Sequence, residues 1–479
     1  KIRTAGAGDN TTSGGAHDDS LVVSDITAPT RSPKPAASPT VTADAALRER
    51  SAGIHFPCLD AYRGIGMTMV LLNHAAYSTG FVFRSDLGPF IARLDLSVPM
   101  FFVLSGFLLY RPFAAAALAG TPMPPAHRFY RRRALRILPA YWVALFGIAA
   151  LFGLQISGAL SWVANVLLLP AVGVPAKVCT GDRCRVAYGI TQAWSIGVEA
   201  IYYLLLPAFA FGVARLVVKR SADARLRTLL ISTGVLYTVG TSFRVFVVTA
   251  EPTWATESLL WLPMYLDLFA VGMALGSLSA ATSAGHRLPR AFDWLSAHPA
   301  ICWALAGAIY LFMTRLSPPA EPFGLNGAEY LPRQFSYGLA SALWLLPAMF
   351  GDQTQGRLRR VLASKPLTYL GAISLSFYLW HLALIEQAKR WTVPDYQERV
   401  ALAANPPPDN ELAALATFVG DYWKVALIAW VLSFAIAAVL HRVVESPFLR
   451  LKDSPLATLV GFRRTGSADV EPAGREGLR

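Results

Sequence analysis

Residues 97–118 read SVPMFFVLSGFLLYRPFAAAAL and carry one charged side chain, Arg111. A helix needs about 20 residues to cross the roughly 30 Å hydrocarbon core of a bilayer, so this stretch is long enough to span a membrane. Comparable apolar stretches recur along the chain, and we predict an all-α integral membrane protein of about ten transmembrane helices. The predicted spans are 58–80, 97–118, 137–155, 191–217, 228–249, 259–279, 299–315, 335–350, 367–388 and 421–442.

The composition agrees with this fold class. Of the 479 residues, 54% are hydrophobic and 15% are charged, whereas soluble domains carry about 25% charged residues. A formal net charge of +13 could indicate a nucleic-acid partner. The basic residues instead form short clusters at the ends of apolar stretches, which is the pattern that sets membrane topology. We therefore predict contact with membrane lipid and no nucleic-acid partner.

The distribution of lysine and arginine predicts the orientation of the helices, because cytoplasmic loops of membrane proteins are enriched in both. Basic clusters occur in 111–136, 215–227 and 352–366, which the predicted spans place on one side. The loop 250–258, on the other side, carries only glutamates. We expect the basic clusters and both termini in the cytoplasm. The short apolar segment 159–172 is then interfacial or re-entrant.

The two ends of the chain differ in composition from its middle. Residues 1–55 are rich in Ala, Thr, Ser, Pro and Asp and contain no long apolar stretch, which predicts a disordered cytoplasmic tail. Residues 451–479 are charged and contain glycine, and they predict a second disordered cytoplasmic tail. Residues 56–450 form the predicted transmembrane domain.

Four cysteines are too few for a disulfide scaffold. Cys179 and Cys184 flank a turn in a loop that we place outside, where a local disulfide is favoured. No second pair of Cys or His stands near them, so we expect no metal site. The sequence contains no Walker phosphate loop, no HExxH and no Gly-x-Ser-x-Gly motif.

Two ionisable residues of the first span are candidates for chemistry, because a charge in hydrocarbon costs at least about 2.5 kcal/mol. Arg63 and His74 both lie in LDAYRGIGMTMVLLNHA, residues 59–75. Eleven steps of about 100° place them on one helix face, roughly 16 Å apart along the axis. Arginine suits phosphate, and histidine can act as a general base or be acylated itself. The alternative is that Arg63 reaches the headgroups and His74 bonds a carbonyl at a helix interface.

Other polar residues stand within or at the start of predicted spans. Ser195 and Glu199, at i and i+4 of the fourth span, share a helix face, and Glu199 could pair with an arginine or orient His74. A purely structural ion pair is the alternative for Glu199. Arg133 and Arg136 begin the third span and could bind phosphate, although most of that basic run is ordinary cytoplasmic charge.

Three further residues have a structural interpretation beside the functional one. His381 stands alone in the ninth span, where a histidine is more often structural than catalytic. Arg244 and Asp267 could simply pair with each other across two helices.

Six blocks of sequence are informative as a set. They are LDAYRG…NH at 59–74, VPMFFVLSGFLL at 98–109, RRALRILPAYW at 132–142, WSIGVEAIYYLLLP at 194–207, SLSFYLWH at 374–381 and VVESPFL at 443–449. In this order and at this spacing they resemble the acyltransferase-3 family of bacterial integral-membrane acyltransferases. Each block alone is weak, whereas six in order are specific. Pro99 departs from the aspartate that many members have at that position.

The resemblance implies a ten-helix membrane O-acyltransferase without a permanently bound cofactor. Such enzymes take an acyl group, usually acetyl from acetyl-CoA in the cytoplasm, and deliver it to a hydroxyl of a sugar, a glycolipid or a small product. The family's essential first-helix pair, its Arg-x-x-Arg motif and its fourth-helix serine and glutamate match Arg63, His74, Arg133, Arg136, Ser195 and Glu199. Ser105 and His381, in two other blocks, are further candidates.

The resulting hypothesis has the three arginines binding the phosphates of acyl-CoA. His74 deprotonates the acceptor hydroxyl or carries the acyl group, and Glu199 orients it. We expect a bacterial plasma membrane (inner membrane) location and a stand-alone form without the fused esterase-like domain of some relatives. The rival interpretation is a transporter or flippase of a lipid-linked glycan or small product. The identity of the acceptor, the acyl chain length and the oligomeric state stay open.

Overall fold

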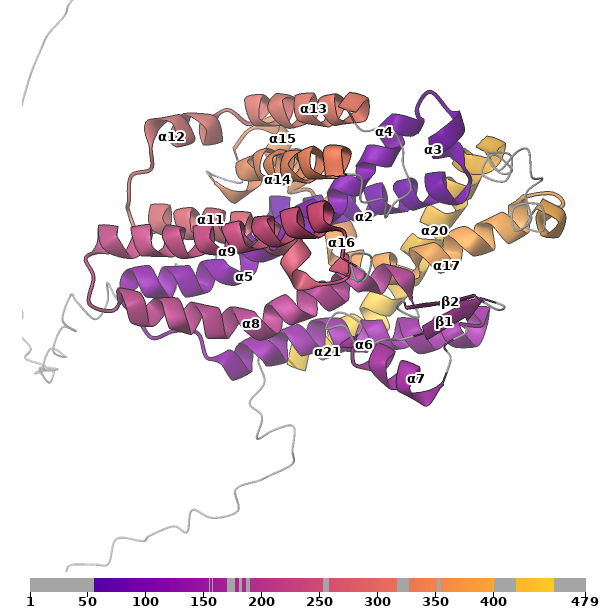
Figure 1. Cartoon of the computed structure of the whole chain (residues 1–479), viewed down its shortest axis with the longest axis horizontal. Coiled ribbons are helices and arrows are strands. Elements are labelled where there is room, and N and C mark those ends of the chain that lie inside the picture. Colours follow the sequence, from indigo (N-terminus) through magenta and orange to yellow (C-terminus); the bar gives the residue numbers. More distant parts are fainter. Residues whose placement is uncertain are drawn as a thin grey trace, which may run out of the picture. The chain divides into compact units, whose positions relative to one another are not determined.

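In the computed structural model of the protein, the described residues are 56–154, 156, 158–169, 177–180, 183–186, 190–252, 258–316, 327–350, 355–399 and 419–451. They are almost entirely helical (Figure 1). The predicted tails, 1–55 and 451–479, lie outside these residues except for Leu451, so their disorder and the proposed domain boundaries stay predictions.

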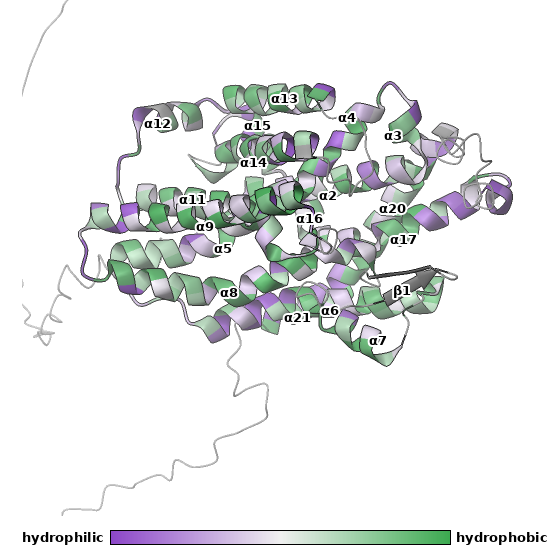
Figure 2. Cartoon of the chain, viewed as in Figure 1, coloured by the Kyte–Doolittle hydropathy of each residue, from purple (hydrophilic) through white to green (hydrophobic). Residues whose placement is uncertain are grey.

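Each predicted span coincides with a long helix. The long helices are α2 (Pro57–Ser78), α5 (Ser97–Ala119), α6 (Ala126–Phe152), α8 (Trp194–Val217), α9 (Ala222–Ala250), α11 (Leu266–Ser283), α13 (Pro299–Leu316), α14 (Gly327–Met349), α17 (Ser374–Thr392) and α20 (Tyr422–Leu440). Large apolar side chains such as Leu204, Ile231 and Leu427 are more than half exposed, which suits contact with lipid tails. Figure 2 shows how apolar residues dominate these helices. The protein is an all-α integral membrane protein, as predicted.

Seven of these helices are long and apolar enough to cross a bilayer, namely α5, α6, α8, α9, α11, α13 and α20. An eighth span results if α16 (Lys365–Ala372) and α17, which meet at an angle of 69°, form one broken crossing. Helices α2 and α14 are 22 and 23 residues long but less apolar. Most residues of α2 are buried against other helices, so it does not need an apolar surface. The count of ten spans and the cytoplasmic location of the termini stay predictions.

Short elements connect the long helices. They are α3 (Phe81–Arg84), α4 (Gly88–Ala92), η1 (Arg93–Leu96), α7 (Ala159–Val166), η3 (Thr191–Ala193), η4 (Leu262–Tyr265), α12 (Arg290–Ala297), α15 (Arg357–Leu362), η5 (Val419–Asp421), the π-helical turn η6 (His441–Glu445) and α21 (Ser446–Arg450). Helix α7 has eight residues, about 12 Å, and is therefore too short to cross a bilayer. The interfacial or re-entrant placement of 159–172 stays a prediction, and residues 170–172 lie outside the described part of the chain.

The described part of the chain contains one small sheet, an antiparallel hairpin of β1 (Lys177–Thr180) and β2 (Arg183–Val186). Its register places Cys179 directly opposite Cys184. Directly opposed positions of an antiparallel pair lie within the distance that a disulfide bridges. The side chains of the hairpin lie outside what the structure describes, so the disulfide itself stays a prediction.

Glycines permit the closest helix contacts. Helices α5 and α11 approach closely at Gly106 and Gly272. A Cβ atom on Gly106 would lie 2.2 Å from the Phe269 carbonyl oxygen, and a Cβ atom on Gly272 would lie 2.0 Å from the Val103 carbonyl oxygen. Helix α2 meets α16 in the same way, because a Cβ atom on Gly371 would lie 1.9 Å from the Asp60 carbonyl oxygen. Small residues allow such backbone approach in membrane proteins, where packing drives helix association.

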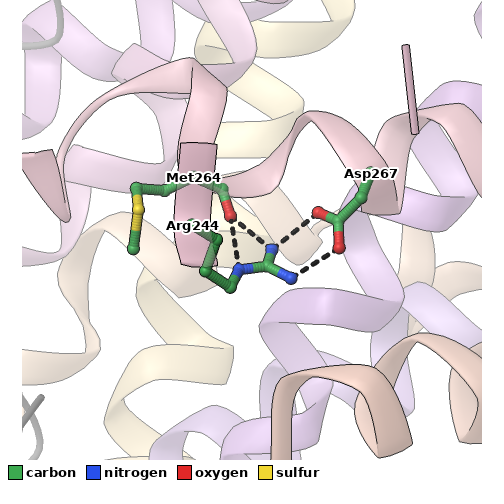
Figure 3. Close-up of polar contacts among 3 residues, drawn as sticks. All are labelled: Arg244, Met264 and Asp267. Carbon is green, nitrogen blue, oxygen red and sulfur yellow. Dashed lines mark hydrogen bonds and ion pairs between the residues drawn. The ribbon is translucent and has the colours of Figure 1, made fainter. Parts of the chain in front are cut away.

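A buried ion pair joins α9 to α11 (Figure 3). The Arg244 guanidinium donates to both carboxylate oxygens of Asp267, at 2.5 and 2.6 Å, and its Nε donates to the Met264 carbonyl oxygen at 3.1 Å. Arg244 and Asp267 are 0% and 2% exposed. The pairing of these two residues was predicted and is confirmed. A bidentate pair with its remaining donor satisfied is the geometry in which two buried charges are tolerated.

We expect Asp267→Ala to destabilise the protein by about 3–5 kcal/mol, because it leaves a buried guanidinium without its counter-charge. Thermal unfolding of the purified protein in detergent measures this as a lower Tm. The double variant Arg244→Met/Asp267→Leu should recover most of the loss, since it removes both charges. Arg315→Ala, at an exposed arginine, is the matched control. A single variant that unfolds at the wild-type temperature would contradict a stabilising role for the pair.

Candidate active site

A cavity of about 370 Å³ lies among helices α2, α5, α6, α8 and α17. Its apolar lining includes Phe101, Leu104 and Leu108 of α5. Four of these helices, α2, α5, α6 and α8, bring six of the predicted site residues to its wall, namely Arg63, Ser105, Arg133, Arg136, Ser195 and Glu199. An apolar pocket with a few convergent polar groups is the usual form of a small-molecule site.

The polar wall of the cavity carries an excess of positive charge, with three arginines against one glutamate. Glu199 accepts a short hydrogen bond from the Ser105 hydroxyl. The Arg63 guanidinium lies 3.7 Å from the Asp60 carboxylate, which stands outside the cavity lining. The cavity therefore favours an anionic ligand over a neutral one.

One cavity arginine has an unused donor. The guanidinium of Arg133 stands over the ring of Tyr203, with its Cζ atom 6.0 Å from the ring centroid. Its Nε atom is buried and makes no hydrogen bond to the described residues. A buried donor without a partner is costly, and a bound anion would satisfy it.

Two histidines meet beyond the cavity. Nδ1 of His74 lies 2.7 Å from Nε2 of His381, and the two ring planes are nearly parallel, 7° apart, with their centroids 5.0 Å apart. Nδ1 of His381 lies 2.5 Å from the Tyr378 carbonyl oxygen. His381 is 1% exposed. The cavity lining includes neither histidine.

Tyr378 joins the cavity to the histidine pair. Its side chain lines the cavity, while its carbonyl oxygen accepts from His381. Its hydroxyl donates to the Gln192 carbonyl oxygen at 2.8 Å and lies 2.8 Å from the Ser195 hydroxyl. The Gln192 amide donates in turn to the Leu379 carbonyl oxygen at 2.5 Å. Helices α8 and α17 are thus linked at the level where the cavity ends.

The structure corrects one expected contact. Glu199 was expected to orient His74, but the hydrogen bonds place Ser105 beside Glu199 and His381 beside His74. The reason is the separation along α2. Glu199 shares the cavity with Arg63, and His74 follows Arg63 by eleven residues, which is roughly 16 Å of helix.

Sequence reasoning missed Tyr378 and Gln192. Tyr378 stands three residues before His381, which is the spacing that places two side chains on one helix face, and this signal could have identified it. Gln192 lies in the short turn η3 before α8, and no local pattern marks it. Among the described residues, no three side chains of His, Cys, Asp or Glu are grouped to hold a metal ion.

Comparison with known protein families finds one match. A family model described as an acyltransferase domain matches residues 56–442. This range contains every residue of the cavity and both histidines.

Two bacterial proteins are similar to the chain at low identity. Nodulation protein 10 of Rhizobium leguminosarum bv. viciae is 26% identical over 292 residues, which are 53% of this chain and 72% of that protein. The putative membrane-bound transacylase BcsY of Komagataeibacter xylinus is 24% identical over 336 residues, which are 67% of this chain and 71% of that protein. No solved structure matches the chain.

We expect Glu199→Gln to lower the Tm at low salt by an amount equivalent to about 1–3 kcal/mol. The substitution leaves three arginines on the cavity wall with no carboxylate among them, and their repulsion is least screened at low ionic strength. Added pyrophosphate should restore the Tm by supplying the missing negative charge. Glu386→Gln is the matched control, because Glu386 pairs with Lys389 and does not line the cavity. An equal response of both variants to pyrophosphate would contradict an anion site in the cavity.

Proposed function

The chain belongs to this acyltransferase family and is a multi-pass membrane acyltransferase, and from that premise we propose that it transfers an acyl group from acyl-CoA to a hydroxyl. The donor is acetyl-CoA or another acyl-CoA from the cytoplasm. The acceptor is a carbohydrate or glycolipid of the cell envelope, or a secreted product. The location is the plasma membrane of a bacterium, since both similar proteins come from bacteria.

The observation that carries this proposal is the cationic cavity. Coenzyme A bears a diphosphate and a further phosphate, and arginine binds phosphate through two parallel N–H donors. Arg63, Arg133 and Arg136 converge on the cavity, and Nε of Arg133 has an unused hydrogen. Arg133 and Arg136 also belong to the basic run that the positive-inside pattern assigns to the cytoplasm, where acyl-CoA is found.

The acyl group must then reach the histidines. The pantetheine arm of coenzyme A is long and flexible, and it separates the phosphates from the thioester. Arg63 and His74 lie roughly 16 Å apart along α2, and such an arm spans this separation. The apolar lining from α5 suits its carbon chain, so binding at the arginines directs the thioester toward Tyr378 and the histidine pair.

His74 acts as the general base in this mechanism. It removes the proton from the acceptor hydroxyl while the hydroxyl oxygen attacks the thioester carbonyl carbon. The carbon–sulfur bond then breaks, and coenzyme A leaves as a thiolate that takes up a proton. One ester forms, one thioester is lost, and the histidine returns its proton to solvent or to the leaving thiolate, which becomes the thiol.

We expect His74→Ala to lower acyl transfer by about 10²–10⁴-fold, which is the usual contribution of a general base. Membranes of cells with either version are treated with mild base, and the released acyl groups and their former carriers are identified by mass spectrometry. One esterified carbohydrate or lipid should disappear in the variant. His298→Ala, at an exposed histidine, is the control. An unchanged ester profile at equal protein level would remove His74 from the mechanism and favour a transporter.

We expect Arg133→Ala to raise the KM for acetyl-CoA by about 10-fold or more, since a hydrogen bond to a charged group contributes roughly 1.5–3 kcal/mol. Arg133→Lys should be intermediate, because lysine keeps the charge but not the paired donors. Initial rates of labelled acetyl transfer in membranes measure both. Arg132→Ala is the matched control, because Arg132 is exposed and does not line the cavity. An equal KM for Arg133→Ala and the wild type would contradict phosphate binding by this residue.

A further inference from the structure

We propose that His381 is a positioning residue that holds His74 in the tautomer whose Nε2 atom is free to accept a proton. The inference rests on the proposed function, in which His74 is the base. Beyond the general base itself, the reactive nitrogen is Nε2 of His74, and the residue that selects it is His381.

The Nδ1 atom of His381 carries a hydrogen. This nitrogen lies 2.5 Å from the Tyr378 carbonyl oxygen. A carbonyl oxygen can only accept a hydrogen bond, so Nδ1 of His381 carries the hydrogen. A lone pair at this nitrogen would face the lone pairs of the oxygen.

The two imidazole rings are uncharged at rest. His381 is 1% exposed, and the described contacts of both rings include no carboxylate. A charged imidazole without a counter-ion is costly to bury. Both rings are therefore neutral at rest, and each carries one hydrogen.

The tautomer of His381 determines the tautomer of His74. Because Nδ1 of neutral His381 holds the hydrogen, its Nε2 has a lone pair. That lone pair faces Nδ1 of His74 at 2.7 Å, so Nδ1 of His74 must carry the hydrogen of that ring. Nε2 of His74 is then left with a lone pair, which is what a general base requires.

Hydrogen bonds from other elements fix helix α17, and with it the position of the His381 ring that selects the tautomer of His74. Next to His381 in α17, the Leu379 carbonyl oxygen accepts from Gln192 and the Tyr378 hydroxyl bonds both η3 and α8. Earlier in the helix, Ser376 donates to the buried carboxylate of Glu445 at 2.5 Å. A histidine free in water prefers its hydrogen on Nε2, so without this support most of His74 would be in the unreactive tautomer.

Two substitutions at His381 separate positioning from packing. His381→Gln keeps an amide oxygen that can accept from Nδ1 of His74, whereas His381→Leu fills similar space without an acceptor. With labelled acetyl-CoA and the endogenous acceptor in membranes, we expect His381→Leu to lower kcat by about 10²-fold or more at an unchanged KM for acetyl-CoA. His381→Gln should keep most of the wild-type kcat. Equal kcat values for the Leu and Gln variants would overturn the proposal.

A spectroscopic measurement on the unaltered protein tests the tautomer directly. Solid-state NMR of the protein with 15N-labelled histidine in lipid nanodiscs distinguishes protonated from unprotonated ring nitrogens, and His74→Ala identifies the signals of His74. We expect an unprotonated Nε2 and a protonated Nδ1 at His74. A protonated Nε2 at neutral pH would overturn the proposal whether or not the variants fold.

The outcomes also separate this proposal from the function on which it rests. Full activity of His74→Ala would remove His74 as the base, and the role of His381 with it, while acyl transfer as the function would stand. Loss of activity in His74→Ala with full activity in His381→Leu would overturn the role of His381 alone. His298→Gln is the matched control, because His298 is exposed and does not line the cavity, and it should leave kcat unchanged.

Discussion

Polar side chains inside a bilayer must find their partners within the protein, because the hydrocarbon core contains no water to bind them. Arg244 and Asp267 meet this constraint completely, since the carboxylate and a backbone carbonyl take up the donors of the guanidinium. Arg133 does not, because its Nε is buried and unused. The same constraint thus produces a structural contact in one place and an unsatisfied donor in another, where we propose that a ligand binds. The difference between them is whether the partner belongs to the chain.

Close helix packing is what gives the polar groups their positions. Gly371 brings α16 against the backbone of α2 at Asp60, and the 69° bend after α16 then directs α17 along α2. His381 reaches His74 only because of this arrangement. On the other side, Gly106 and Gly272 bring α5 against α11, and Ser105, next to Gly106 in α5, donates to Glu199 of α8. A side chain at any of these glycines would move a site residue as well as a helix.

The sequence predicted the features that depend on one helix at a time. Hydropathy located the spans, and a spacing of eleven residues placed Arg63 and His74 on one face of α2. The neighbour of His74 was not predictable in this way, because His381 lies 307 residues further along the chain and its approach depends on the bend between α16 and α17. Helix α2 also illustrates a limit of hydropathy, since most of its residues are buried among other helices and it needs no strongly apolar surface.

The proposed phosphate site and the histidine pair lie at different levels of helix α2. Arg63 lies at the cavity and His74 lies beyond it, roughly three turns further along α2. Tyr378 stands between these levels, with its hydroxyl bonded to α8 and its carbonyl oxygen holding His381. In the proposed mechanism, a donor bound by its phosphates therefore reaches the histidine pair only through its flexible arm. The proposed mechanism thus separates the phosphate site from the site of acyl transfer by roughly 16 Å, which is about half of the hydrocarbon core.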